Sequence, residues 1–318
     1  MKSLKIIFMA TPDFALPCLD LLHLSEHRII ALVTRPDRPG GRGRLVRPSP
    51  AKQWALKNRV EVNQPRSMND KTFLAWLEEK SPDLIVTTAF GRLLPEAVLK
   101  LPPLGCINLH ASYLPAYRGA APIHRAVIDG AGYSGVSVIF LSEELDAGDI
   151  IVQETEEISP FDTAGMLHDR LAVRGASLLL KAVDALASGT AKAVPQDPAL
   201  ATYAPPLKPE DEKLDWRSSP MELYNRIRGL NPWPGAYTTL KSKRLKVWRA
   251  ARPQERSQDK IEQPPGTILA VGEQSLTVAA GGGALTLLDL QPAGKKTMDA
   301  GSFCCGYRIA PGDRLGGE

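Results

Sequence analysis

The sequence predicts an α/β fold, with a doubly wound, mostly parallel sheet in an N-terminal domain and a smaller β-barrel at the C-terminus. In the first half of the 318-residue chain, short apolar runs alternate with segments of helical periodicity, which is typical of parallel sheets covered by helices. Residues 195–209 contain five prolines and are typical of a linker. We therefore expect domains at residues 1–194 and 210–318, joined by that linker.

The elements of the N-terminal domain follow from apolar runs and capping residues. Continuous apolar runs indicate buried parallel strands, and Ser49 and Thr163 stand where helix caps are expected. Strands are expected at 4–9, 28–34, 60–62, 83–87, 107–110 and 135–141, and an extended arm at 151–157. Helices are expected at 14–22, 50–57, 71–79, 120–128 and 163–188.

Residues 35–50 interrupt this alternation with a long basic loop. They hold five arginines against one aspartate, among four prolines and three glycines. We expect no helix or strand to run through such a composition. A long structureless loop in a compact domain is usually functional or disordered, and the fork of an arginine side chain suits phosphate oxygens.

The C-terminal domain is expected to begin with a helix and to continue with short strands. The helix is expected at 220–229, and the strands at 236–240, 244–250, 266–271, 275–279 and 284–290. Residues 208–318 carry 17 basic and 13 acidic side chains, whereas the preceding 207 residues carry 22 of each. A small basic barrel is a common platform for nucleic acid, although a run of Lys and Arg is more often a solvated face.

Composition disfavours several classes of protein. The four cysteines show no CxxC spacing, so we expect neither a disulfide framework nor a metal site, and a reducing, cytoplasmic location. No window approaches the roughly 18 apolar residues of a membrane span. No GxGxxG pattern follows the first strand, which disfavours a Rossmann-type dehydrogenase. Nothing in the sequence indicates an obligate partner subunit, and we expect a monomer.

The stretch at residues 106–125 is the candidate site. In an extended chain Asn108 and His110 leave the same face of the strand, and a loop rich in proline and glycine follows. Open α/β sheets place their sites at such strand ends, although an ordinary strand end with a solvated histidine fits this segment about as well. Asp146 lies in a later loop, where its carboxylate could orient a histidine or form only local turn hydrogen bonds.

These residues lie within longer motifs: SYLP at 112–115, RGAAP at 118–122 and LDAGD at 145–149. Further motifs are TPDFA at 11–15, PDRP at 36–39, PSP at 48–50, NPWP at 231–234, LQPAGKK at 290–296 and PGDRLG at 311–316. Together they resemble the formyltransferase family that uses 10-formyltetrahydrofolate, in its tRNA-dependent branch. The resemblance covers essentially the whole chain, and it implies a folate-binding catalytic domain followed by a barrel of OB type.

The resemblance also implies a reaction, the transfer of a formyl group from 10-formyltetrahydrofolate to the α-amine of methionine esterified to initiator tRNA. We expect Asn108 and His110 to donate hydrogen bonds to the tetrahedral oxyanion. We expect Asp146 to orient His110, to favour its charged form and to help take the proton of the attacking amine, directly or through water. A charged donor binds an oxyanion more strongly than a neutral one does.

For the folate co-substrate, we expect the segments at 87–94, 112–115 and 141–146 to wall the pterin pocket. A pterin ring needs polar backbone groups beside a flat apolar slot. The expected contacts are Phe90, Gly91, Leu93, Ser112, Tyr113, Leu114, Pro115 and Leu141.

For initiator methionyl-tRNA, we expect two basic regions to bind the phosphate backbone, which dominates such affinity. The loop at 35–47 would grip the acceptor end, with Arg42 as the preferred contact, and a strip at 241–256 would follow the backbone. The expected contacts are Arg38, Arg42, Arg44, Arg47, Lys243, Arg244, Lys246 and Arg249.

Two other kinds of protein share part of this pattern. A formyltetrahydrofolate hydrolase, or a formyltransferase for a nucleotide sugar or another small amine, would share Asn108, His110 and Asp146. None of these needs both the arginine-rich loop and a basic barrel. A non-catalytic RNA-binding protein would fit the barrel alone, and the complete trio argues against it.

Overall fold

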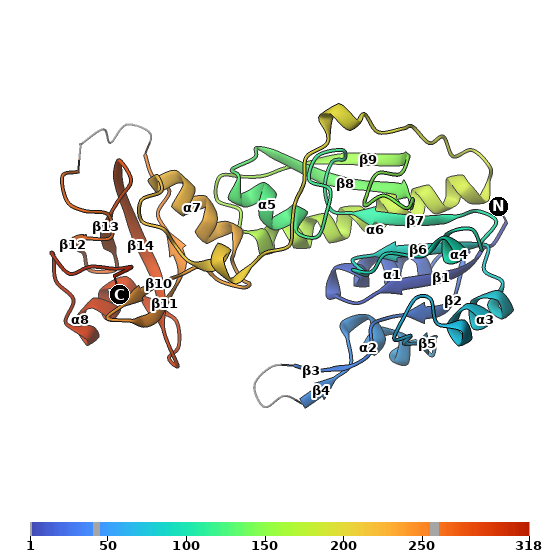
Figure 1. Ribbon diagram of the computed structural model, residues 1–318, viewed down its shortest axis with the longest axis horizontal. Coiled ribbons are helices and arrows are strands. Elements are labelled where there is room, and N and C mark those ends of the chain that lie inside the picture. Colours follow the sequence, from blue (N-terminus) through green and yellow to red (C-terminus); the bar gives the residue numbers. More distant parts are fainter. Residues whose placement is uncertain (1, 41–44, 255–260, 318) are drawn as a thin grey trace. The chain divides into compact units, whose positions relative to one another are not determined.

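The computed structural model describes residues 2–40, 45–254 and 261–317, which fall into two compact units (Figure 1). The first unit comprises Met1–Pro122, Ser134–Glu156 and His168–Pro205, and the second comprises Ile123–Tyr133, Glu157–Leu167 and Pro206–Glu318. Each unit therefore draws on separate stretches of the chain. The contiguous domain limits inferred from the sequence, 1–194 and 210–318, remain a prediction.

The first unit is built on a seven-stranded sheet with the order β5-β2-β1-β6-β7-β8-β9. The ladders from β5 to β7 are parallel, and β7 pairs antiparallel with β8. The strands are β1 (Lys5–Ala10), β2 (Arg28–Val33), β5 (Glu61–Asn63), β6 (Leu84–Thr88), β7 (Cys106–His110), β8 (Tyr133–Phe140) and β9 (Ile150–Glu157). The predicted mostly parallel α/β sheet is confirmed, and the expected extended arm is its edge strand β9.

Two helices of this part of the chain, α2 and α6, begin at caps that the sequence indicated. The Ser49 hydroxyl accepts a hydrogen bond from the Lys52 backbone N–H (3.2 Å), and the Thr163 hydroxyl accepts one from the Met166 N–H (3.2 Å). The helices are α1 (Leu16–His23), α2 (Pro50–Lys57), α3 (Lys71–Lys80), α4 (Glu96–Leu99) and α6 (Ala164–Ala187). Helix α6 packs closely on β7, because a Cβ atom at Gly175 would lie 2.7 Å from the Leu109 side chain.

The basic loop differs from the prediction that no strand would run through it. Strands β3 (Arg38–Gly40) and β4 (Leu45–Arg47) form an antiparallel pair in which Arg38 faces Arg47 and Pro39 faces Val46. The prediction was wrong because proline interrupts a central strand, whereas a two-stranded ribbon has outward positions that need no N–H. At its base, Asp37 accepts hydrogen bonds from Lys52 (2.5 Å) and Gln64 (2.9 Å).

The second unit contains an antiparallel sheet with the order β10-β11-β14-β13-β12, to which β15 adds beside β14. The strands are β10 (Tyr237–Leu240), β11 (Lys243–Ala250), β12 (Ile268–Val271), β13 (Leu276–Ala280), β14 (Gly283–Pro292) and β15 (Met298–Asp299). This unit also contains most of α5 (Pro122–Ile128), together with α7 (Pro220–Gly229) and α8 (Ala300–Tyr307). The smaller C-terminal β domain that the sequence predicted is thus confirmed.

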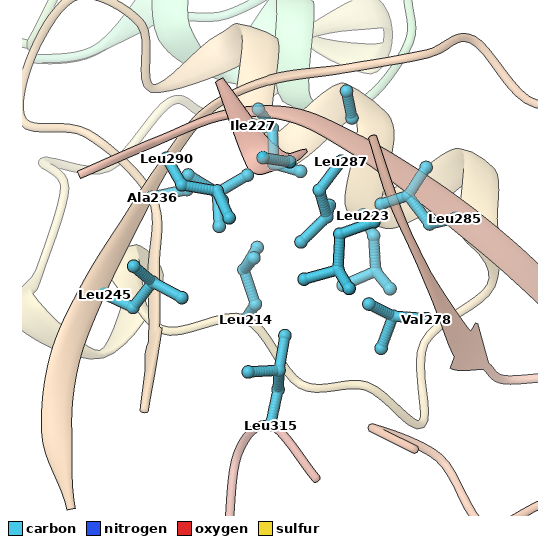
Figure 2. Packing of buried hydrophobic residues seen from close by; sticks show 14 of the residues in the cluster. Leu214, Leu223, Ile227, Ala236, Leu245, Val278, Leu285, Leu287, Leu290 and Leu315 are labelled. Atoms are coloured by element: carbon cyan, nitrogen blue, oxygen red, sulfur yellow. The ribbon is translucent and has the colours of Figure 1, made fainter. Parts of the chain in front are cut away.

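The core of the second unit forms between the inner face of this sheet and helix α7. Figure 2 shows Leu223 and Ile227 of α7 beside Leu285, Leu287 and Leu290 of β14. All five side chains are buried. Strand β15 and helix α8 were not expected, because two glycines weaken the helical pattern of α8. Helix α8 forms because Asp299 caps its Ser302 N–H (2.7 Å) and because Phe303 is buried in the same core.

Candidate active site

Strands β6 and β7 place Thr87 and Asn108 side by side at the carboxyl end of the parallel part of the sheet. The Thr87 hydroxyl lies 2.7 Å from Asn108 Oδ1, closer than to the Ile107 carbonyl at 3.3 Å. Because this bond uses the amide oxygen as acceptor, the amide NH₂ group of Asn108 is left to act as a donor. Asn108 is half-buried, in accordance with a polar group at the edge of the core.

His110 lies two residues further along β7 and is buried. Its Nε2 lies 3.0 Å from the Tyr117 carbonyl, so Nε2 carries a proton, since a carbonyl can only accept. Its Nδ1 lies 3.5 Å from Asp146 Oδ2. The two ring nitrogens of His110 thus face two different oxygens, the Tyr117 carbonyl and the Asp146 carboxylate. The structure therefore brings His110 and Asp146 together, as the sequence analysis expected.

Asp146 is held by its backbone as well as by its carboxylate. Its φ of +50° lies in the left-handed region, and its Oδ2 accepts a hydrogen bond from the Gly119 N–H at 2.9 Å. Gly119 itself has a φ of +124°, and a Cβ atom there would lie 2.7 Å from the Ala204 carbonyl oxygen. Only glycine fits at this position of the RGAAP motif, and its N–H is the one that binds Asp146.

Cys106, the first residue of β7, is the only thiol on that strand. Burial raises the pKa of the Cys106 thiol to about 12. A thiol with such a pKa is protonated at neutral pH and is not a nucleophile. Asn108, His110 and Asp146 therefore stay the candidate catalytic residues at this strand end.

The expected folate contacts divide into buried and accessible side chains. Phe90, Ser112 and Leu114 are buried, so these residues can offer a ligand mainly backbone groups. Leu93 is 68% exposed and Tyr113 is 43% exposed, so their side chains are accessible.

Two side chains fix the backbone of these folate segments. The Arg35 guanidinium donates to the carbonyls of Phe90 (3.1 Å) and Gly91. The Ser137 hydroxyl accepts from the Leu114 N–H (3.1 Å) and donates to the Ser112 carbonyl (2.8 Å). Pro115 and Leu141 are half-buried, and Gly91 is exposed with a φ of +68°. This combination of fixed polar backbone and accessible apolar side chains is compatible with a pterin.

Six of the eight expected nucleic-acid contacts lie in strands of two antiparallel pairs that the structure describes. Arg38 and Arg47 are paired in the β3–β4 ribbon, and Arg47 is exposed. Arg42 and Arg44 lie outside the described residues. Lys243, Arg244, Lys246 and Arg249 belong to β11.

The charges on β11 are partly compensated. Arg249 binds Asp289 (2.7 Å), and Arg244 lies 3.8 Å from Glu212 while stacking 3.7 Å above the Tyr237 ring. Lys246 donates to the Pro234 carbonyl (2.7 Å), and Lys243 is exposed. The β11 strip therefore carries less uncompensated charge than its composition indicated.

Sequence reasoning missed two residues that contact this site. The Arg118 guanidinium binds Gln196, and Gln196 binds the backbone around Asp146. Arg118 belongs to a motif that the sequence analysis quoted, which was a usable signal. Gln196 lies in the proline-rich stretch interpreted as a linker, and nothing in that stretch marks it.

Among the residues that the structure describes, no cluster of three or more His, Cys, Asp or Glu side chains is arranged to hold a metal ion. Within the same residues, no helix is both long and apolar enough to cross a membrane.

The fold and this strand-end site define a class of protein. Residues 3–183 match the model of the formyl transferase family, and residues 206–308 match the model of the formyl transferase C-terminal domain. The chain belongs to the formyl transferase family.

Particular relatives narrow this class. A methionyl-tRNA formyltransferase of Moorella thermoacetica is 47% identical over 313 residues, which cover 98% of this chain and 99% of the relative. A methionyl-tRNA formyltransferase of Halalkalibacterium halodurans is 46% identical over 318 residues, which cover 99% of each chain.

Solved structures agree on the fold. The sugar 3N-formyl transferase WlaRD superposes with a TM-score of 0.67 at 16% identity, covering 93% of this chain and all (100%) of that one. HypX from Aquifex aeolicus in complex with tetrahydrofolic acid superposes with a TM-score of 0.61 at 17% identity, covering 98% of this chain and 48% of that one. At these identities the likeness shows the fold.

Proposed function

We propose that this protein is a methionyl-tRNA formyltransferase. It moves the formyl group of 10-formyltetrahydrofolate to the free α-amino group of methionyl-initiator tRNA, giving N-formylmethionyl-tRNA for translation initiation. The observation that carries this function is the 46–47% sequence identity to methionyl-tRNA formyltransferases over nearly the whole chain. The His110–Asp146 contact beside Asn108 supports it. Because the proposed substrate is a tRNA used in translation initiation, we propose that the enzyme acts in the cytoplasm. We propose separately that it acts as a monomer.

In the proposed mechanism, the α-amine attacks the formyl carbon, and the carbonyl oxygen becomes an oxyanion. The Asn108 NH₂ group donates to that oxygen, because Thr87 already occupies the amide oxygen. His110 can donate from Nε2 only by exchanging its bond to the Tyr117 carbonyl for one to the oxyanion. The Asn108 donor is preorganised, because Thr87 orients its amide before charge develops, and such a donor lowers the barrier.

Asp146 has two tasks in this proposal. Its carboxylate lies beside His110 Nδ1 and stabilises the charged ring. It also helps to take the proton that the attacking amine loses, directly or through a water molecule. That proton then becomes available to the departing N10 nitrogen as its bond to the formyl carbon breaks, so the transfer needs no external base.

The folate would bind along the segments at 87–94, 112–115 and 141–146, and supplies the formyl group. The residues there fit a pterin, because the hydrogen bonds of Arg35 and Ser137 hold the backbone of these segments in place. Leu93 and Tyr113 offer accessible apolar surface beside them. We expect Leu93→Asp to raise the KM for 10-formyltetrahydrofolate while the KM for tRNA stays unchanged, since a charge in an apolar slot disfavours the ring.

The decisive experiment offers the protein several acceptors for labelled formyl. Methionyl-initiator tRNA is incubated with labelled 10-formyltetrahydrofolate, and an elongator tRNA charged with methionine serves as control. We expect label on the initiator methionine and little on the elongator. Label that appears only as free formate or on a small amine would instead indicate the hydrolase or the small-molecule transferase.

The catalytic roles have their own test. We expect Asn108→Ala and His110→Ala each to lower the single-turnover rate of formyl transfer by about 10²–10³, the usual loss for one oxyanion donor. The measurement is a rapid-quench assay with both substrates saturating. An unchanged rate in either variant would refute the assignment of that residue.

A further inference from the structure

We propose that Gln196, itself held by Arg118, is a positioning residue that sets the place of Asp146 for formyl transfer. The inference rests on the proposed function, because Asp146 matters here as a partner of His110. It adds to the catalytic trio two residues that lie far from it in the sequence.

The amide of Gln196 uses its whole hydrogen-bonding capacity in this arrangement. Its Oε1 accepts from Arg118 Nε (3.0 Å) and Nη2 (2.7 Å). Its Nε2 donates to the carbonyl of Asp146 (2.8 Å) and to the carbonyl of Gly148 (2.7 Å). A side chain with two acceptor sites and two N–H groups is required, so glutamine matches the site and glutamate does not.

The backbone of Asp146 needs such support. Its φ of +50° is a conformation that L residues rarely adopt. In this conformation the carboxylate is directed at the Gly119 N–H and at His110 Nδ1. Without the two bonds from Gln196, the 146–148 turn can relax toward ordinary backbone angles, and the carboxylate then moves away from His110.

Arg118 fixes Gln196 from the other side. Arg118 is 6% exposed, and its backbone pairs with the segment that carries Gln196: the Arg118 N–H donates to Thr202 O (2.8 Å), and the Ala204 N–H donates to Arg118 O (2.7 Å). The two residues next to Arg118 contact the catalytic pair directly. Tyr117 supplies the carbonyl bound by His110, and Gly119 supplies the N–H bound by Asp146.

Three consecutive residues, 117–119, therefore form hydrogen bonds with His110, Gln196 and Asp146, respectively. Because these hydrogen bonds all come from residues 117–119, the distance between the His110 imidazole and the Asp146 carboxylate depends on one short stretch of backbone. Gln196 completes the arrangement by tying the turn of Asp146 to the same stretch.

A double-mutant cycle tests the proposal in the full-length enzyme. Gln196→Met keeps the length of the side chain and removes its hydrogen bonds, and Asp146→Asn removes the charge that Gln196 is proposed to place. We expect Gln196→Met alone to lower the single-turnover rate about 10- to 100-fold, as a misplaced catalytic group does. In the Asp146→Asn background the same change should cost less than about 2-fold, because residues that act as a unit are not additive.

A second variant and a matched control complete the design. Gln196→Glu keeps the acceptor for Arg118 but loses both N–H donors, so we expect a loss at least as large as for Gln196→Met. Gln291→Met is the control, because Gln291 is also half-buried, accepts one N–H from Trp248 and donates to one backbone carbonyl, that of Lys295. We expect Gln291→Met to keep the wild-type rate.

Each outcome has a distinct meaning. Equal losses from Gln196→Met in both backgrounds, or a wild-type rate for Gln196→Glu, would overturn the positioning role while leaving formyl transfer intact. If Gln196→Met does not fold, the cycle is run with Gln196→Glu and decides in the same way. Absence of formyl transfer by the wild-type enzyme would instead overturn the proposed function.

Discussion

A single hydroxyl decides which atom of Asn108 faces the reaction. Thr87 occupies the amide oxygen from the neighbouring strand, and this bond leaves the NH₂ group as the donor. Strand alternation in the sequence could place Asn108 and His110 on one face of β7. It could not reveal which amide atom is free, because Thr87 reaches Asn108 only through the β6–β7 register.

We expect Thr87→Val, which keeps the side-chain shape and removes the hydroxyl, to lower kcat by about 5- to 10-fold. The loss corresponds to about 1 kcal/mol for one hydrogen bond, since the amide of Asn108 would then rotate freely. Thr87→Ser is the control and should keep the rate near that of the wild type. Steady-state formylation measures both variants, and a kcat for Thr87→Val equal to the wild-type value would contradict this orientation.

Most of the residues around the trio were within reach of sequence analysis, and Gln196 was not. A sequence motif pointed to Asp146, and the chemistry that the family resemblance implied then predicted its contact with His110. Gln196 has no periodic pattern and no motif around it, and its bonds join residues 50 and 78 positions away. Such a contact exists only once the chain has folded, so local physical chemistry could not predict it.

At the scale of elements, capping residues predicted helices well. Helices α2 and α7 have the bounds expected from Ser49 and from the run at 220–229. The β3–β4 ribbon and helix α8 were missed for one common reason: each has weak local propensity and is stabilised by pairing or burial. Pattern reasoning fails where tertiary contacts outweigh propensity.

One carboxylate joins two neighbouring strands of the parallel sheet. Asp83, just before β6, accepts a hydrogen bond from the Lys5 N–H of β1 at 2.7 Å and one from the Lys2 ammonium at 3.2 Å. The backbone hydrogen bond from Lys5, and secondarily Lys2, lowers the pKa of Asp83 in the folded protein.

A lowered pKa in the folded state means that ionised Asp83 stabilises the fold at neutral pH. This contribution is complete above the unfolded pKa of about 3.9 and is lost as the pH falls through the lower, folded pKa. We expect Asp83→Asn to reduce the free energy of unfolding by about 1 kcal/mol at pH 7, and the difference to shrink below about pH 4. Urea denaturation across this pH range measures it, and a difference that grows in acid would contradict the assignment.

At the scale of the whole molecule, the excess of basic charge lies in residues 208–318, but its distribution matters more than its sum. Arg249 already binds Asp289, whereas Lys243 is exposed. Composition alone weighted these two cations equally. The structure distinguishes them, since the compensating carboxylate comes from β14, across the antiparallel ladder.

We expect Lys243→Ala to lower the slope of log affinity against log salt by about 1, as the loss of one phosphate contact does. Arg249→Ala should change the slope less, because its guanidinium is already engaged by a carboxylate. Binding of initiator tRNA at several salt concentrations measures both slopes. A full unit lost in Arg249→Ala and none in Lys243→Ala would reverse this ranking.

The fold class was predictable because apolar runs alternating with helical segments fix a parallel sheet with helices. The interleaving of the two units was not, because residues 123–133 and 157–167 resemble any other crossover segment in the sequence. Their place depends on packing, as when Tyr224 of α7 donates to the Pro160 carbonyl (2.9 Å) and buried Arg228 donates to the Asp162 carbonyl (3.0 Å).

The bonds made by Gln196 bear on how related enzymes can be recombined. A chimera fused at residue 194 would take Arg118 from one parent and its glutamine from the other. The parts from both parents could fold in such a chimera, but its turnover rate would still fall if the parents differ in the turn at 146–148. Swaps of acceptor specificity between homologues should therefore transplant residues 117–119 and 196 as a set, with the crossover placed beyond residue 205.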